Sequence, residues 1–436
     1  MSKNSGKMAM LVGGGPAPGI NGVISAATIE ACNHGTEVIG FQDGFQYLMK
    51  GDKDHCRSLR IEDVKNYALR GGSMLGTSRA NPTKSEKDMA TVLRVLNEMG
   101  VTELVTIGGD DTAFSASQVY KKGQGAVRVA HVPKTIDNDL PLPGSTPTFG
   151  FETAREVGVK IIRNLAEDAR TTSRWYLVIS MGRAAGFLAL GIGKASAATL
   201  TIIPEEYQRR QVTLDEVCDQ LVGAVIKRLS QGSPYGVAVL AEGLLEAIGE
   251  KGLIGVMTEE QLSRYGKVDK DPHGHLRLGE IEFGRMVKDR VSARLKELKV
   301  SATLIDKDLG YELRCADPNP FDAEYTRDLG YAAVKFLRSE ASRQFGAIIT
   351  VIDGRMVPLK FEDVIVPETG RMKPRKVNVE GEAFECARRY MIRLERADLE
   401  DPEKLARLAA TVDLEPKKFR ERFGYLVGLG EGPGAR

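Results

Sequence analysis

The chain has 436 residues, and its 61 Lys and Arg against 59 Asp and Glu leave a formal net charge of +2. This near balance gives no argument for a nucleic acid or an anionic membrane as partner, so anion binding must come from local clusters of charge. The apolar runs, such as Ala347–Ile352, are too short to span a bilayer, and the polar residues Met1–Lys7 lack the apolar core of a signal peptide.

Short apolar strands alternate with amphipathic helices along the chain. In the first series the strands are predicted at Met8–Val12, Glu37–Phe41, Leu104–Ile107 and Val127–Val132, and the helices at Asn21–His34, Glu86–Met99 and Asp111–Lys121. In the second the strands are predicted at Trp175–Ser180, Thr199–Ile203 and Gly236–Ala241, and the helices at Glu152–Arg170, Arg183–Lys194 and Thr213–Gln231. The alternation predicts an α/β fold of two Rossmann-like lobes with largely parallel sheets, whose ligand sites lie at the carboxyl ends of strands.

Residues 244–298 are more charged and less regular than their surroundings, and we expect a helical insertion there with an exposed loop at Lys267–Arg277. The five cysteines and five histidines are scattered, with no CxxC spacing. A zinc site is therefore not expected, and a cytoplasmic protein with reduced thiols is the natural reading.

Two predicted strands end in glycine-rich turns. Met8–Val12 runs into Gly13-Gly14-Gly15-Pro16, where the backbone could approach a phosphate or simply form a tight turn. Leu104–Ile107 runs into Gly108-Gly109-Asp110-Asp111-Thr112. The two aspartates could cap the next helix, or could hold Mg²⁺ together with substrate phosphates, and a phosphate loop nearby favours the second interpretation.

The strand Val127–Val132 ends in Pro133-Lys134-Thr135-Ile136-Asp137-Asn138-Asp139. One carboxylate here could accept a hydroxyl proton while the other organises a metal, and Lys134 could neutralise a phosphoryl group in transfer. The alternative is a turn that Asp and Asn stabilise locally. Three such loops at three strand ends favour chemistry over turn formation.

Arginines in glycine-containing loops are candidate phosphate ligands, because the guanidinium fork matches phosphate oxygens. They are Arg79 in Gly-Thr-Ser-Arg, Arg183 in Met-Gly-Arg and Arg314 in Tyr-Glu-Leu-Arg. A fourth, Arg174, comes just before the predicted strand Trp175–Ser180. Glu242, which closes the strand Gly236–Ala241, supplies an acceptor suited to sugar hydroxyls.

Together these motifs resemble the 6-phosphofructokinases. Gly-Gly-Gly-Pro-Ala-Pro-Gly-Ile-Asn, Gly-Thr-Ser-Arg, Gly-Gly-Asp-Asp-Thr, Pro-Lys-Thr-Ile-Asp-Asn-Asp, Gly-Phe-Glu-Thr-Ala, Met-Gly-Arg and Ala-Glu-Gly occur in the order typical of that family. The match covers about Met8 to Gly243 and resumes at Tyr311–Arg314. Pro16, where many members carry Asp, and Ile305, where an Arg is expected, depart from the pattern.

The resemblance implies a role for each matching position. Asp137 would be the proton acceptor, Lys134 would stabilise the transition state, and Asp110, with Asp139 as a second candidate, would coordinate Mg²⁺. The donor would contact Gly14, Gly15, Arg79, Gly109 and Thr112. Fructose 6-phosphate would contact Thr135, Ile136, Asp137, Arg174, Met181, Gly182, Arg183, Glu242, Tyr311 and Arg314. Arg174 resembles the arginine that reaches a neighbouring subunit's sugar site, so a homodimer or homotetramer is expected.

Two departures bear on the phosphoryl donor. ATP-dependent members usually carry glycine where this chain has Asp111 and Lys134. A charged side chain at 111 would crowd and repel a nucleotide's α-phosphate, and Lys134 would place a cation beside pyrophosphate. Both residues are similar to those of the pyrophosphate-dependent subgroup.

The sequence therefore predicts reversible transfer from pyrophosphate to the 1-hydroxyl of fructose 6-phosphate, a glycolytic reaction. The alternatives are an ATP-dependent 6-phosphofructokinase and a non-catalytic subunit, which would be expected to lose the acidic loop. We expect residues 1–150 to form the donor and Mg²⁺ lobe, with parts of 315–370 returning to it. Residues 151–314 would bind the sugar phosphate, and residues 371–436 would form C-terminal helices and a tail.

Overall fold

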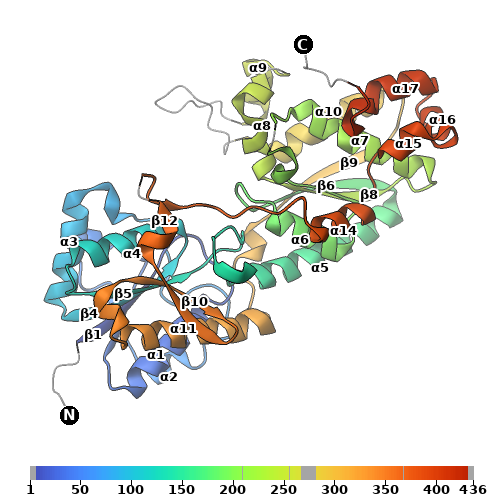
Figure 1. Ribbon diagram of the computed structural model, residues 1–436. Helices are drawn as coiled ribbons and strands as arrows, with labels where there is room; N and C mark the ends of the chain where they lie inside the picture. The colour runs from blue at the N-terminus through green and yellow to red at the C-terminus, as the bar shows by residue number, and fades with distance from the viewer. Residues whose placement is uncertain (1–5, 209, 255, 267–280, 367, 431–436) are drawn as a thin grey trace. The chain divides into compact units, whose positions relative to one another are not determined.

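A computed structural model describes residues 6–208, 210–254, 256–266, 281–366 and 368–430. The chain divides into two compact units (Figure 1). The first unit comprises Met1–Val157 and Tyr311–Arg375, and the second comprises Gly158–Gly310 and Lys376–Arg436. These divisions fall a few residues from the expected lobe boundaries at 150/151, 314/315 and 370/371, and residues 376–436 belong to the second unit.

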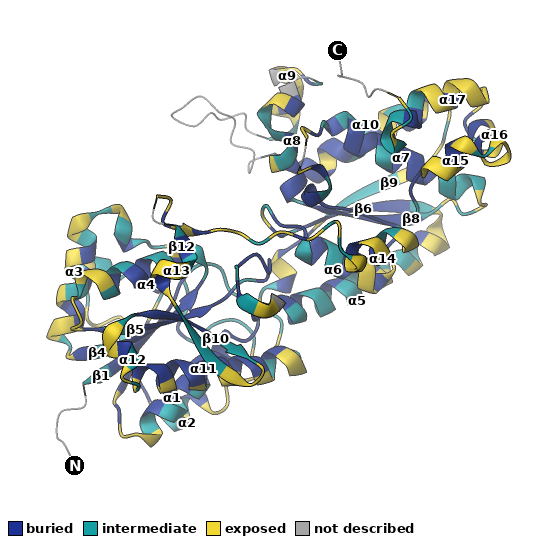
Figure 2. Ribbon diagram, in the orientation of Figure 1, coloured by how far each residue is buried: buried dark blue, intermediate teal, exposed yellow. Residues whose placement is uncertain are grey.

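The first unit is built on a seven-stranded sheet with the order β11-β10-β5-β4-β1-β2-β3. Its central strands are parallel, and the pairs β2–β3 and β10–β11 are antiparallel. The strands are β1 (Lys7–Val12), β2 (Val38–Phe41), β3 (Cys56–Leu59), β4 (Val101–Gly108), β5 (Arg128–Pro133), β10 (Ala347–Ile352) and β11 (Arg355–Lys360). The apolar β1, β4 and β5 are almost wholly buried, as expected for parallel strands covered on both faces (Figure 2).

Helices cover both faces of this sheet, and the sheet separates two hydrophobic cores, one under each layer of helices. The helices α1 (Ile20–Asn33) and α11 (Pro320–Leu337) pack together on one face, and α3 (Glu86–Glu98) and α4 (Asp110–Lys122) lie over the other (Figure 1). Short elements complete the unit: α2 (Ile61–Val64), α12 (Ala341–Gln344), α13 (Phe361–Val364), and the hairpin of β12 (Ile365–Val366) and β13 (Arg371–Met372).

The second unit is built on a four-stranded parallel sheet with the order β7-β8-β6-β9. The strands are β6 (Arg174–Ser180), β7 (Leu200–Ile202), β8 (Gly236–Ala241) and β9 (Thr303–Leu309). The larger helices are α5 (Phe151–Thr172), which contains the division between the units, α6 (Phe187–Ser196), α7 (Leu214–Ser230), α8 (Gly243–Ile254) and α10 (Phe283–Glu297). The C-terminal helices are α14 (Glu382–Tyr390), α15 (Arg396–Glu400), α16 (Pro402–Ala410) and α17 (Pro416–Phe423).

The helical character of the expected insertion appears in α8, α9 (Glu259–Leu262) and α10, whereas the predicted loop at Lys267–Arg277 lies outside the described residues. One predicted helix begins in the wrong place. We expected it to start at Arg183, but α6 starts at Phe187. Arg183 has a left-handed backbone (φ 48°), and Gly186 is the residue that precedes the helix, so the Met-Gly-Arg segment is a loop.

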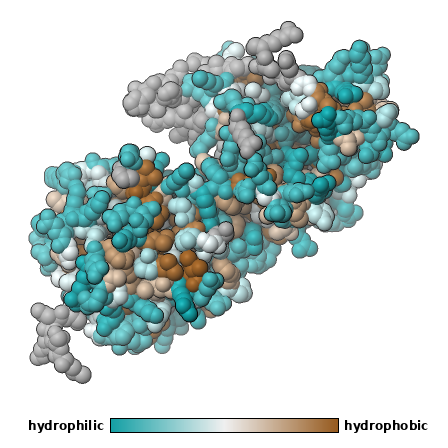
Figure 3. Space-filling model, viewed as in Figure 1, coloured by the Kyte–Doolittle hydropathy of each residue, from teal (hydrophilic) through white to brown (hydrophobic). Residues whose placement is uncertain are grey.

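Hydrophilic residues cover most of the surface that is visible in Figure 3. Among the described residues, no helix combines the length and the apolar composition needed to cross a membrane.

Candidate active site

Three strand-end loops of the first unit lie side by side. The strands β5, β4 and β1 are consecutive and parallel in the sheet, so their carboxyl ends, Pro133, Gly108 and Val12, meet at one edge. The Lys134 amide donates to the Gly108 carbonyl (2.8 Å), and the Gly13 amide donates to the Ile107 carbonyl (2.8 Å). The fold thus brings together the glycine loop and the two acidic loops that the sequence singled out.

The glycine loop is shaped by its close neighbours. A Cβ added to Gly13 would lie 2.3 Å from the Thr112 hydroxyl oxygen, so only glycine lets α4 approach β1 so closely. Gly14 has a φ of +83°, its amide donates to the Ser78 carbonyl (2.8 Å), and its carbonyl accepts from the Thr77 hydroxyl (2.6 Å). The Gly-Thr-Ser-Arg motif therefore supports this loop through Thr77 and Ser78. Arg79, the last residue of the motif, is exposed.

Two cationic side chains reach the glycine loop. The Lys134 ammonium donates to the Gly15 carbonyl and would lie 3.2 Å from a Cβ at Gly14, although Lys134 itself is only 6% exposed. The Arg314 guanidinium carbon would lie 3.5 Å from a Cβ at Gly15. This arrangement concentrates positive charge where the backbone amides of a strand–helix turn already favour an anion.

The loop after β5 buries its polar groups. Asp137, Asn138 and Asp139 are each 6–7% exposed, and Ile136 is buried beside them. The Asp137 amide donates to the Thr135 hydroxyl (3.0 Å). Burying carboxylates is costly unless the surroundings satisfy them, so such a loop needs support from elsewhere in the fold.

Arg375, the last residue of the first unit, fixes the backbone of this loop between the two carboxylates. Its Nε donates to the Asn138 carbonyl (2.7 Å), its Nη2 donates to the Asn138 side-chain oxygen, and its amide donates to the Asp139 carbonyl (2.8 Å). The same Asn138 oxygen accepts from the Thr148 amide (3.0 Å). Asn138 has a φ of 57°, a conformation that asparagine tolerates better than most residues.

Asp110 and Asp111 form the first turn of α4, after Gly109. Asp111 is exposed, whereas Asp110 is partly buried at the strand end. No group of three or more His, Cys, Asp or Glu side chains suited to a metal occurs among the described residues. One or two carboxylates at a phosphate site nevertheless match the way in which proteins hold Mg²⁺, since phosphates and water complete its coordination.

His131 lies beneath these loops on β5. It is fully buried, and its Nδ1 lies 2.8 Å from the hydroxyl oxygen of Thr106 on the neighbouring strand β4. Burial lowers the pKa of His131 to about 3. The ring is therefore neutral at physiological pH and joins the two strands that carry the acidic loops.

The second unit has its own cluster of strand-end residues. Met181 follows β6, and its amide donates to the Leu309 carbonyl of β9 (2.9 Å). Glu242 follows β8, and its carboxylate accepts from the Arg183 amide (2.6 Å). Gly182 is buried and Arg183 is exposed. The adjacent ends of β8, β6 and β9 thus place an arginine and a carboxylate in one loop cluster.

The predicted sugar ligands Arg174, Tyr311 and Arg314 lie neither in this cluster nor in the loop after β5. Arg174 is the first residue of β6 and Met181 follows its last, so about 20 Å of strand separates them. Tyr311 is 79% exposed and lies under the Arg314 guanidinium, 5.0 Å from its ring centre. Tyr311 and Arg314 belong to the first unit, where Arg314 faces the glycine loop.

Sequence reasoning missed two residues that hold the site. Arg375 has no motif around it, and only the fold brings it to Asn138. Asp322 is fully buried and accepts from the Gly150 and Thr153 amides, both at 2.8 Å, which joins α11 to the start of α5. Burial raises the pKa of Asp322. A sequence signal existed only for Asp322, since an acidic residue two positions after a proline is typical of the first turn of a helix, here α11.

Curated relatives match almost the whole chain. A pyrophosphate–fructose 6-phosphate 1-phosphotransferase of Thermotoga maritima is 50% identical over 425 residues, which cover 97% of this chain and 99% of the relative. An enzyme of the same name from Naegleria fowleri is 48% identical over 433 residues, which cover 98% of this chain and 97% of the relative.

Solved structures agree on the fold. A phosphofructokinase from Saccharomyces cerevisiae aligns with a TM-score of 0.64 at 19% identity, covering 96% of this chain; the chain spans about half of that protein, 50%. The model of the family described as phosphofructokinase matches residues 7–337. These residues contain all three strand-end loops of the first unit and the loop cluster of the second, and the chain belongs to the phosphofructokinase family.

Proposed function

We propose that this chain transfers a phosphoryl group reversibly from pyrophosphate to the 1-hydroxyl of fructose 6-phosphate. The names of the two relatives near half identity support this activity. The observation that carries the donor assignment is the Lys134 ammonium at the Gly15 carbonyl. A fixed cation at a phosphate loop suits a compact, highly charged donor that brings no nucleoside for further contacts.

Pyrophosphate would bind on the edge formed by β5, β4 and β1. The backbone of Gly14 and Gly15 and the start of α4 offer amides and a helix N-terminus to its oxygens. The residues proposed to contact it are Gly14, Gly15, Arg79, Gly109 and Thr112. Asp111 would act in donor choice, because its exposed carboxylate would repel the additional phosphate of a nucleotide.

Asp137 would accept the proton of the sugar's 1-hydroxyl. As the proton leaves, the hydroxyl oxygen forms a bond to the nearer phosphorus, and the bridging P–O bond of pyrophosphate breaks with its electron pair retained by the departing phosphate. Lys134 would neutralise the charge that develops on the phosphoryl oxygens. Microscopic reversal of the same steps returns pyrophosphate.

Mg²⁺ would be held by Asp110, with Asp139 as the second candidate, and by phosphate oxygens. Bound there, it would neutralise pyrophosphate charge and orient the phosphoryl group. The two proposed ligands suit Mg²⁺, since Asp110 and Asp139 are carboxylates beside a phosphate loop.

Fructose 6-phosphate would be bound by Thr135, Ile136, Met181, Gly182, Arg183, Glu242, Tyr311 and Arg314. Arg174 lies at the opposite end of β6 from Met181, so it would contribute to the sugar site of a neighbouring copy. We therefore propose a homo-oligomer, working in the cytoplasm as expected of a glycolytic enzyme.

The test is a paired-donor assay of the purified enzyme with fructose 6-phosphate and Mg²⁺, run in both directions. We expect turnover with pyrophosphate and little with ATP. Turnover with ATP that equals or exceeds that with pyrophosphate would replace this proposal by the ATP-dependent alternative. No turnover with either donor would favour a non-catalytic subunit.

The variant Asp111→Gly with Lys134→Gly sharpens the donor assignment. Removing both charges should impair pyrophosphate use and improve the ratio of ATP to pyrophosphate turnover. If pyrophosphate activity is unchanged and nucleotide use does not improve, the charge argument is wrong.

A further inference from the structure

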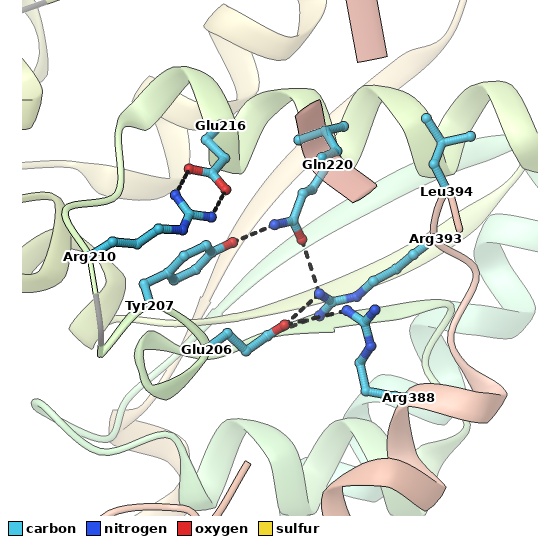
Figure 4. A pocket seen from close by; sticks show the side chains of 9 residues that line it. Glu206, Tyr207, Arg210, Glu216, Gln220, Arg388, Arg393 and Leu394 are labelled. Atoms are coloured by element: carbon cyan, nitrogen blue, oxygen red, sulfur yellow. Dashed lines mark hydrogen bonds and ion pairs between the residues drawn. The ribbon is translucent and has the colours of Figure 1, made fainter. Parts of the chain in front are cut away.

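The second unit contains a pocket that includes none of the predicted site residues. It lies between the short 3-10 helix Pro204–Tyr207, the helix α7, the helix α14 and the segment that follows α14 (Figure 4). The lining residues are Glu206, Tyr207, Arg210, Glu216, Gln220, Arg388, Arg393, Leu394 and Leu426. The pocket therefore joins residues that are far apart in the sequence, and its walls are mostly polar.

The charges of the lining residues do not cancel. Arg210 pairs with Glu216, and Arg393 pairs with Glu206 at 2.6 and 3.0 Å. Arg388 also points at Glu206 (Figure 4), but only at 3.5 Å and toward the oxygen that Arg393 already contacts at 2.6 Å. Three guanidinium groups thus share two carboxylates. Since an arginine stays protonated in a protein, the pocket has an excess of positive charge.

Neighbouring charges do not remove this excess. Burial and the positive charge of Arg393 lower the pKa of Arg388, which is the direction expected where guanidinium groups crowd together. The carboxylate of Glu395 also acts on Arg388, but with a smaller effect on its pKa than Glu206, and it caps the start of α15. Arg388 is therefore the cation of this pocket with the weakest partner.

A chain of hydrogen bonds in the pocket also leaves a surplus of hydrogen-bond donors. Arg393 donates to the Gln220 side-chain oxygen (3.0 Å), and because a guanidinium has no acceptor this contact fixes the orientation of the amide. The Gln220 nitrogen must then donate to the Tyr207 oxygen (2.5 Å). The Tyr207 hydroxyl hydrogen is left to donate elsewhere, and the structure records no acceptor for it among the described residues.

The nitrogen Nε of Arg393 repeats the pattern. Arg393 is 5% exposed, and within the described part of the chain this buried donor has no hydrogen-bond partner. A buried donor without an acceptor is costly, so a pocket with two such donors in its lining residues has affinity for a group that only accepts hydrogen bonds. An anion meets this need and the excess of positive charge together.

The size of the pocket narrows the class of anion. Its volume of about 170 Å³ is well below the roughly 300–1,000 Å³ of sites that enclose drug-sized ligands. A single tetrahedral oxyanion fits within this volume, whereas it could enclose only part of a nucleotide or a sugar bisphosphate. Arginine forks bind the oxygens of such an ion in pairs.

We infer that this pocket binds one small tetrahedral oxyanion of the orthophosphate class, held by Arg388 and by the Tyr207 hydroxyl. The bound ion links the C-terminal segment to the residues that follow β7, and so stabilises the second unit. The site would bind orthophosphate whichever donor the reaction uses, because no residue of the proposed catalytic machinery lines it.

The experiment is isothermal titration of the enzyme with orthophosphate at constant ionic strength, without added metal and with fructose 6-phosphate saturating. The variant is Arg388→Gln. The matched control is Arg389→Gln, which makes the same charge change one residue along α14, where the side chain is 76% exposed. Loss of one charge-assisted contact should weaken this binding about 10- to 100-fold in Arg388→Gln and leave it unchanged in the control.

The variant Tyr207→Phe removes only the hydroxyl donor and is expected to weaken phosphate binding about 3- to 10-fold. It decides the question if Arg388→Gln does not fold. Equal titrations of Arg388→Gln and Arg389→Gln, or no phosphate binding in the parent, would overturn the site. Tight binding of AMP that depends on Arg388 would overturn the assignment to a single small oxyanion.

Discussion

The two units both place their candidate site loops at the carboxyl ends of parallel strands, yet the contacts and the burial of these loops differ. In the first unit the loop after β5 buries Asp137, Asn138 and Asp139, and Arg375 clamps its backbone. In the second unit Arg183 is exposed, and its amide donates to the Glu242 carboxylate. The same architecture thus supports one deeply buried polar loop and one open loop.

The difference has a physical reason. Carboxylates that are removed from water need a fixed set of partners, since an unsatisfied buried charge is strongly destabilising. Groups held in this way are preorganised, which favours chemistry. An exposed arginine keeps its hydration and flexibility, which suits the capture and release of a phosphate ester. We therefore expect substitutions in or beneath the loop after β5 to reduce turnover, and substitutions at the Arg183 loop to weaken sugar binding.

The largest effect is expected for Asp137→Asn. The amide cannot accept the proton of the 1-hydroxyl, so kcat with pyrophosphate should fall by about 10²- to 10⁴-fold while the KM values change little. Steady-state kinetics in both directions measure this effect, and circular dichroism checks that the variant is folded. A kcat within tenfold of the parent would remove Asp137 from the role of proton acceptor.

Arg375→Ala tests whether the clamp is what distinguishes the first unit. Without the two side-chain contacts to Asn138 the acidic loop should shift, and kcat should fall by about 10- to 100-fold. Guanidinium ion added to the assay should restore part of the activity, which a general loss of stability would not allow.

The matched control for this clamp is Arg371→Ala, on the exposed side of the short strand β13. It removes the same charge from the same segment and should leave kcat unchanged. If both alanine variants lose activity equally, the effect belongs to the segment and not to the clamp.

Glu242→Ala makes the corresponding change in the second unit. The Arg183 backbone has a left-handed φ of 48°, which costs free energy unless its surroundings hold it, and the Glu242 carboxylate is the contact recorded at its amide. We expect the KM for fructose 6-phosphate to rise about tenfold, with the KM for pyrophosphate unchanged. A fall in kcat alone would contradict the division of tasks between the two regions.

The parts of the site that could be predicted from the sequence are those whose residues are constrained locally. Glycines and aspartates directly after apolar strands mark strand ends, and the parallel order of the sheet then brings these ends together. The predicted start of α6 was wrong because nothing in the local sequence indicates that the backbone of Arg183 is left-handed. The strand β9 was not predicted because three consecutive charged residues, Asp306, Lys307 and Asp308, interrupt its apolar pattern, and it lies at the edge of the sheet with most of its residues only partly buried. Arg375 could not be predicted, since its contact spans 237 positions of sequence.

His131 provides a test that leaves turnover almost unchanged. Burial lowers its pKa to about 3, whereas the imidazole of an unfolded chain titrates near 6.5. At a pH between these two pKa values, the imidazole binds a proton in the unfolded chain but not in the folded protein. The contribution of His131 to the free energy of unfolding is therefore complete above about pH 6.5 and decreases as the pH falls, by about 1.4 kcal/mol per pH unit.

His131→Asn should remove this dependence while keeping a polar atom near the Thr106 hydroxyl. Urea unfolding at pH 7.5 and pH 5 measures it: the parent should lose about 2 kcal/mol more than the variant over this interval. The exposed His34→Asn is the control and should behave as the parent does. An equal loss in parent and His131→Asn would mean that the ring is hydrated or already protonated beneath the loops. The strands under the first unit's acidic loops would then be less tightly packed than the burial of His131 indicates.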